Sequence, residues 1–67
     1  MKIFAERIKE LRTEKGLTLK KVAEELEVSY VSLHEYENNK YEPSHELTLK
    51  IAQYYNVSIG YLFGVED

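Results

Sequence analysis

Apolar residues recur at helical spacing along nearly the whole sequence, in short runs separated by residue types that begin or end helices. The first run lies in residues 2–15 and contains Ile3, Phe4, Ile8 and Leu11. Gly16 follows this run and can adopt the positive φ with which many helices end. No segment shows the sustained alternation of apolar and polar residues that marks a strand. The sequence therefore predicts an all-helical protein.

Serine and threonine residues predict where the later helices begin, because a side-chain oxygen there accepts a hydrogen bond from a free N–H of the first turn. The candidate caps are Thr18, Ser29, Ser44 and Ser58, and the helices are expected to end near Leu26, Asn38, Tyr55 and Gly64. Asn38, Asn39 and Pro43 indicate a loop between the third and fourth helices. We expect five short helices, which must pack together to be stable, in a single domain spanning residues 1–67.

Small size limits how such a domain can be stabilised. With 67 residues and no cysteine, the chain can form only a small core and no disulfide. His34 and Glu37 have the i, i+3 spacing found at some metal sites, but this pair, with His45 as the second imidazole, is weak evidence for one. We expect no metal and no cofactor, so packing, helped by a partner chain where one binds, must provide the stability.

The sequence also argues against catalysis and against a membrane location. It contains no glycine-rich phosphate loop and no recognisable nucleophile, histidine and carboxylate set, and a chain this short cannot enclose a sizeable pocket. No stretch approaches the roughly 18 apolar residues that cross a bilayer, and the N-terminal MKIFAERIKELR becomes charged before a signal sequence could form. We expect a cytoplasmic protein that is not an enzyme and binds neither membranes nor small molecules.

Residues 19–38 have the layout of a helix-turn-helix, in which a small residue lets two helices pack at a steep angle. Ala23 is that small residue, and the internal apolar positions are Val22, Leu26, Val28, Leu33 and Tyr36. In this arrangement the second helix projects outward, so that its N-terminal half can enter a DNA major groove about 12 Å wide. The pattern favours a nucleic-acid-binding function.

Four segments resemble the Cro/CI-type, or XRE-like, regulators, a family that includes lambdoid phage repressors and controller proteins of restriction systems. They are RIKELRTEKGLT at 7–18, VAEELEVS at 22–29, YENNKYEPS at 36–44 and LKIAQYYNVSIGYLFG at 49–64. The resemblance implies a lambda-repressor-like fold in which the second and third helices form the helix-turn-helix. Residues from about 44 to 67 would then complete the core and form a dimer interface.

The resemblance also implies a DNA-contacting surface. The base-contacting residues would be Tyr30, Val31, Ser32, His34 and Glu35, which are more apolar and acidic than is usual in the family. Phosphate contacts are expected from Lys20, Lys21, Ser29, Asn38, Asn39 and Lys40, with help from helix N-termini. Glu27 and Asn39 stand where the family usually has glycine, and Leu19 stands where it often has glutamine.

Two further sets of residues have structural roles in this interpretation. The resemblance implies a partly buried ion pair between Arg12 and Glu37, which would link the first helix to the end of the third. The dimer interface is expected to include Tyr54, Ile59, Tyr61, Phe63 and Val65, because this segment is more apolar than a solvated tail requires.

These observations lead to one main function and one alternative. The main prediction is a homodimeric transcriptional regulator, a repressor that binds double-stranded DNA at a palindromic operator, because one small domain alone reads too few base pairs for tight, selective binding. The net charge of -3 opposes this prediction, since DNA binding depends on cationic side chains. The alternative is a protein-binding module of the same fold, an antitoxin or antirepressor, with Tyr30 and Val31 in the contact surface.

Overall fold

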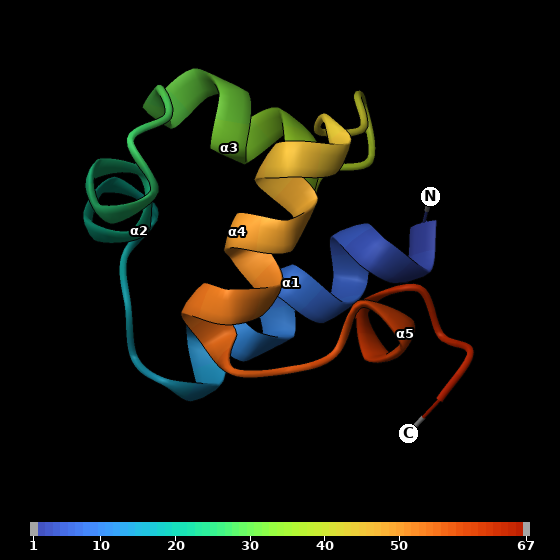
Figure 1. Ribbon diagram of the computed structural model, residues 1–67. Helices are drawn as coiled ribbons and strands as arrows, with labels where there is room; N and C mark the ends of the chain where they lie inside the picture. The colour runs from blue at the N-terminus through green and yellow to red at the C-terminus, as the bar shows by residue number, and fades with distance from the viewer. Residues whose placement is uncertain (1, 67) are drawn as a thin grey trace.

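The computed structural model describes residues 2–66, and five helices lie within this range (Figure 1). They are α1 (Lys2–Glu14), α2 (Leu19–Leu26), α3 (Tyr30–Glu37), α4 (His45–Tyr55) and α5 (Ile59–Leu62). No strand occurs among the residues described. The predicted all-helical class and the number of helices are therefore confirmed.

Each helix after the first begins at a capped N-terminus. The capping oxygens of Thr18, Ser29, Ser44 and Ser58 accept hydrogen bonds from the backbone N–H groups of Lys21, Ser32, Leu47 and Tyr61, at 2.9–3.1 Å. Each bond satisfies one of the N–H groups that the first turn of a helix leaves without an intrahelical partner. The helix starts predicted from these four residues are confirmed.

The residues directly after α2 and α4 have a left-handed backbone conformation. Glu27 follows α2 with φ 60°, and Asn56 follows α4 with φ 56°. The N–H of each residue donates back into the helix, which satisfies carbonyl groups of the last turn. Asparagine tolerates this region well, whereas glutamate has a steric cost of roughly 1–2 kcal/mol there.

The helices surround one apolar core. Figure 1 shows α2 and α5 at opposite ends of the molecule, with α1 and α4 between them and α3 lying beside α2. The core consists of Phe4, Ile8, Leu11, Val22, Ala23, Leu26, Leu33, Ile51, Ala52, Tyr55 and Leu62. Tyr36, predicted to be internal, is half-buried and packs against this core, as does Leu47 of α4, while Ile3 is 43% exposed at the start of α1.

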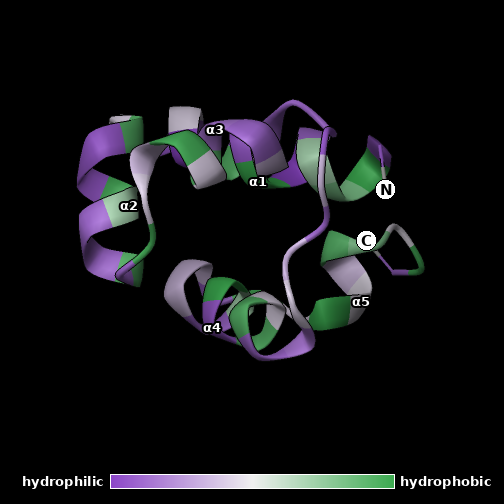
Figure 2. Ribbon diagram, turned by 90° about the horizontal axis from the view of Figure 1, so that it is seen from above, coloured by the Kyte–Doolittle hydropathy of each residue, from purple (hydrophilic) through white to green (hydrophobic). Residues whose placement is uncertain are grey.

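Hydropathy follows the packing. In Figure 2 the hydrophobic residues of α2 lie on the side turned toward the other helices, and its hydrophilic residues face away from them. Val22, Ala23 and Leu26 are its buried residues. Among residues 2–66, no helix combines the length and the apolar character needed to span a bilayer.

The segment after α4 is held against α1. The Arg7 guanidinium donates to the Tyr61 carbonyl at 2.7 Å and lies 4.3 Å from the centre of the Tyr61 ring. The Phe63 ring stacks on Phe4 with 5.3 Å between ring centres. Four of the five residues predicted for the dimer interface also pack within the chain, namely Tyr54, Ile59, Tyr61 and Phe63. The fifth, Val65, is 80% exposed.

Candidate nucleic-acid interface

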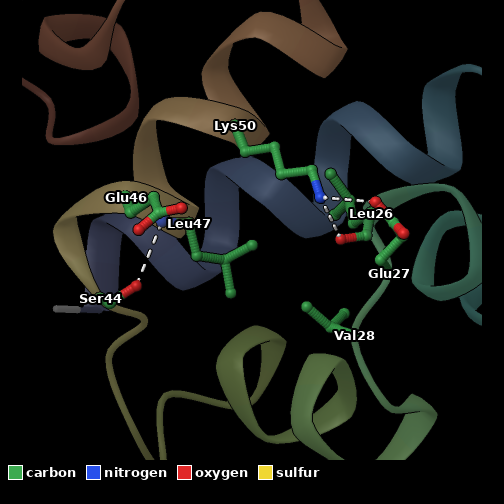
Figure 3. A pocket seen from close by; sticks show the side chains of 7 residues that line it. All are labelled: Leu26, Glu27, Val28, Ser44, Glu46, Leu47 and Lys50. Carbon is green, nitrogen blue, oxygen red and sulfur yellow. Dashed lines mark hydrogen bonds and ion pairs between the residues drawn. The ribbon is translucent and has the colours of Figure 1, made fainter.

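The turn between α2 and α3 is held by packing against the core and by a lysine of α4. Its residue Val28 packs against the core, and Val28 and Leu47 of α4 line a shallow hollow of about 200 Å³ (Figure 3). Across this hollow the Lys50 ammonium donates to the Leu26 carbonyl at 2.8 Å and lies 3.3 Å from a carboxylate oxygen of Glu27. Lys50 thus binds the end of α2, and α4 sets the position from which α3 begins.

Lys50 was not anticipated from the sequence. It lies 24 residues from the carbonyl it binds, and no local spacing rule connects a lysine on one helix with the end of another. A cation near a helix C-terminus is favourable because free carbonyls gather there. The one signal in the sequence was that Glu27 occupies a position where the family usually has glycine, which indicates a strained end of α2 that a contact from another helix could stabilise.

The other end of α3 is fixed by an ion pair. Arg12 and Glu37, the two residues paired by the family resemblance, form two hydrogen bonds of 2.8 and 3.1 Å. A third Arg12 N–H donates to the Leu17 carbonyl at 2.9 Å. The Glu37 side chain is only 2% exposed, and its hydrogen bond raises the pKa of Arg12 despite partial burial. The pair joins α1 to the C-terminal turn of α3.

With both ends fixed, α3 presents its remaining faces to solvent. Leu33 and Glu37 point inward, while Tyr30 and Val31 are 53% and 63% exposed. His34 is exposed as well, and its ring stacks on that of Tyr30 with 6.4 Å between centres. Ser32 and Glu35 are partly exposed. All five predicted base-contacting residues therefore have some access to solvent.

The first turn of α3 is organised internally. The Ser29 hydroxyl accepts from the Ser32 N–H and donates to the Ser32 hydroxyl at 2.8 Å. Ser29, predicted to contact phosphate, and Ser32, predicted to contact bases, are therefore hydrogen-bonded to each other. The Ser32 hydroxyl remains able to donate one further hydrogen bond.

The residues predicted to contact phosphate flank α3 in the chain. Lys20, Lys21 and Lys40 are exposed, and only Lys21 has an ion-pair contact within residues 2–66, at 3.9 Å from Glu25. The Asn38 side-chain amide donates to the His34 carbonyl at 2.7 Å, so one of its N–H groups is already used at the end of the helix. Asn39 has φ 60°, the conformation for which the family usually has glycine.

The two residues considered for a metal site point different ways. Glu37 is turned inward to Arg12, whereas His34 lies on the exposed face of α3. Within residues 2–66, no group of three histidine, cysteine, aspartate or glutamate side chains is arranged to hold a metal ion.

Comparison with known proteins agrees with this geometry. The sequence profile of a family described as "Helix-turn-helix domain" matches residues 5–67. The chain belongs to this helix-turn-helix family. It is also similar to "HTH-type transcriptional regulator ImmR" of Bacillus subtilis (strain 168), with 37% identity over 64 residues, which cover 96% of the chain and 50% of the relative. The chain therefore spans about half the length of this curated relative. The resemblance to XRE-like regulators is confirmed.

In this helix-turn-helix protein, α2 and α3 are the two helices of the motif, and the turn between them is residues 27–29. They pack directly against each other, while α1 and α4 contact them from the inner side. The family therefore explains why the structure supports α3 at both ends and leaves its outer side uncovered within the chain.

Proposed function

We propose that this helix-turn-helix protein is a transcriptional regulator that binds double-stranded DNA in a sequence-specific manner through α3. The observation that carries this proposal is the exposure of Tyr30 and Val31 at the start of a helix whose inner face is firmly anchored. Side chains at that place can reach base edges when the helix enters a major groove. A regulator of this kind acts on DNA in the cytoplasm.

Local charge supports the proposal despite the overall charge of -3. Lys20 precedes α3 in the chain and Lys40 follows it, and neither has an ion-pair partner among the described residues. Exposed charges are screened over about 10 Å at 0.1 M salt, so nearby lysines count more for phosphate binding than distant glutamates. The N-termini of α2 and α3 add backbone N–H groups suited to anions.

We further propose that the protein acts as a homodimer and represses transcription by occupying a palindromic operator. A single domain that reads four or five base pairs binds with little selectivity, and a two-fold symmetric dimer doubles the site. Residues 1–67 would form one domain, with the part from about 44 onward completing the core and pairing the subunits. The proposed interface comprises Tyr54, Ile59, Tyr61, Phe63 and Val65, of which Val65 is the most exposed.

A fluorescence anisotropy titration with labelled duplexes from upstream of the protein's own gene tests the DNA-binding proposal. We expect saturable binding to one inverted repeat, and an affinity that falls steeply as salt rises from 50 to 200 mM, because bound phosphates release counterions. No preference over an unrelated duplex at any salt concentration would refute sequence-specific binding.

Charge variants test the proposed phosphate contacts in the same assay. Lys20→Gln and Lys40→Gln should each weaken binding to all duplexes alike and reduce the slope of log affinity against log salt by about one. Lys9→Gln makes the same change on the exposed face of α1 and should have little effect. Equal effects of the three variants would show that the two lysines contribute only net charge.

The acidic composition and the exposed Tyr30–Val31 surface favour a second candidate, a protein-binding module that acts as an antitoxin or antirepressor. In that case the duplex titration would show no sequence preference, while Tyr30→Ala would abolish binding to a partner protein encoded by a neighbouring gene. Saturable binding to one inverted repeat in the titration excludes this candidate as the main role of α3.

A further inference from the structure

The helical geometry of α3 shows which of its positions lie opposite the core. Residues advance about 100° around a helix axis, so the positions two before and two after a given residue lie on the opposite side. Leu33 is 2% exposed and defines the inner side. Val31 and Glu35 are each two positions from it and are one helical turn apart. These two residues lie opposite Leu33 around the helix axis, Val31 exposed and Glu35 partly exposed, and we call them the apex pair.

Val31 gives the apex pair an apolar end. Its side chain is 63% exposed, has no polar atom, and is attached to a β-branched carbon that restricts its rotation. Among the groups at base edges in the major groove, the apolar one is the C5 methyl of thymine, which 5-methylcytosine also carries. Next to it in the chain, Tyr30 stacks its ring on that of His34.

Glu35 gives the pair an anionic end. Within the described part of the chain, its carboxylate makes no ion pair and no hydrogen bond, while its backbone carbonyl accepts from the N–H groups of Asn38 and Lys40. An ionised carboxylate only accepts hydrogen bonds. It is therefore repelled by phosphates and by the acceptor atoms N7 and O6 of guanine. It is matched best by cytosine, whose amino group is its only major-groove hydrogen-bonding group, because the amino group of adenine has the acceptor N7 beside it.

We propose that the apex pair selects a half-site with two pyrimidines, in which Val31 contacts a C5 methyl group and Glu35 accepts a hydrogen bond from a cytosine amino group. Four residues of helix rise by about 6 Å, close to two base steps, so the two contacts fall on nearby bases. The inference rests on the proposed DNA-binding function and specifies which groups on the bases the apex pair recognises. A carboxylate without a partner also disfavours binding to base pairs that offer it no hydrogen-bond donor, and this makes the contact selective.

The experiment begins by selecting duplexes that bind the protein from a pool of random double-stranded sequences. In the best duplex, each thymine is then replaced in turn by deoxyuridine, which removes only the C5 methyl. We expect one position per half-site at which affinity falls about fourfold, the factor for burying one methyl group. At that position, a comparison of cytosine with 5-methylcytosine shows whether the methyl is read from thymine alone or from either base.

Two variants link these effects to the apex pair. Val31→Ala should remove the difference between thymine and deoxyuridine, and Glu35→Gln should reduce the roughly tenfold preference for cytosine at the neighbouring position, because glutamine also donates. Leu49→Ala and Glu46→Gln make matched changes on the exposed face of α4 and should leave both preferences unchanged.

The outcomes separate this inference from the function on which it rests. If no duplex is enriched and none binds with a steep salt dependence, the DNA-binding proposal itself fails. If a duplex binds specifically but no methyl substitution matters, or if the effects persist in Val31→Ala and Glu35→Gln, only the apex assignment is wrong. Circular dichroism melting of both variants checks that they are folded.

Discussion

At the scale of single residues, Glu27 is the clearest case of local strain. It holds φ 60° at the end of α2, a conformation that glycine adopts freely and that a side chain with a Cβ atom disfavours. Its contact with Lys50 offers little compensation, because the two side chains are 82% and 44% exposed, and exposed ion pairs contribute at most about 1 kcal/mol. The second Lys50 contact, to the Leu26 carbonyl, does not depend on the glutamate side chain.

Replacing Glu27 with glycine should therefore stabilise the protein. We expect Glu27→Gly to raise the free energy of unfolding by about 0.5–1 kcal/mol, since relief of the left-handed strain exceeds the added flexibility of the unfolded chain. Urea unfolding followed by circular dichroism measures the change. Glu27→Ala is the control, because it also loses the carboxylate but keeps the Cβ atom, and it should not be stabilising. A similar gain in both variants would contradict the strain explanation.

Tyr54 makes stability depend on pH in the alkaline range. Its pKa is raised to about 12 by burial and by the hydrogen bond that its hydroxyl donates to the Glu25 carboxylate. In the unfolded chain it titrates near 10. Between pH 10 and 12 the unfolded state therefore loses the proton while the folded state keeps it, and the contribution to stability is lost as pH rises through this window.

The variant Tyr54→Phe should have a smaller loss of stability between pH 10 and 12 than the wild type. Burial also raises the pKa of Tyr55, which is left intact, so part of the alkaline loss should remain. Urea midpoints measured at intervals from pH 8 to 12 give the comparison. Parallel curves for the two proteins would show that Tyr54 is not a source of this pH dependence.

At the scale of elements, the attachment of α3 to α1 depends on a buried ion pair. The Glu37 carboxylate is 2% exposed and takes both of its short hydrogen bonds from Arg12. A buried charge that loses its partner is strongly destabilising, whereas replacing both partners with apolar side chains of similar size is often neutral. The arrangement therefore predicts strong coupling between the two positions.

We expect Arg12→Met to lower the free energy of unfolding by roughly 3–5 kcal/mol, and the double variant Arg12→Met, Glu37→Met to recover most of that loss. Chemical unfolding of the wild type, both single variants and the double variant gives the coupling energy. Additive effects in this cycle would mean that the pair does not hold α3. Lys9→Met, on the exposed side of α1, provides the control for loss of a cation.

For the whole molecule, the proposed dimer depends on which apolar side chains the fold leaves exposed. Tyr61 and Phe63 already pack on α1 within the subunit, so they can contribute only their remaining exposed edges to an interface. Val65 is 80% exposed and lies next to Gly64, whose position would bring an added Cβ within 2.9 Å of Ile3. This places two exposed apolar side chains, Ile3 and Val65, in the same region.

If this region pairs the subunits, Val65→Asp should shift the protein from dimer toward monomer and weaken operator binding together. Sedimentation velocity over a range of concentrations, with and without duplex, measures the assembly. Leu49→Asp introduces the same charge on the exposed face of α4 and should leave assembly unchanged. A wild type that is monomeric at every concentration and binds DNA as one copy would contradict the dimer proposal.

The helices of this protein can be predicted from its sequence alone. Apolar spacing and the caps at Thr18, Ser29, Ser44 and Ser58 depend on interactions within one turn, so they can be predicted without knowing the rest of the fold. The exposed side of α3 also follows from local periodicity once Leu33 is placed inside. The pairing of Arg12 with Glu37 came from family resemblance, since no local rule joins residues 25 positions apart.

The contacts between distant helices become known only from the packed fold. It placed Lys50 against the end of α2, packed Tyr61 and Phe63 on α1, and left the Glu35 carboxylate without a partner among the described residues. These facts depend on where distant side chains meet after packing, and short-range patterns contain no information about such contacts. For the same reason, helix spacing indicated which residues α3 exposes, but packing determined which of them remain free to bind another molecule.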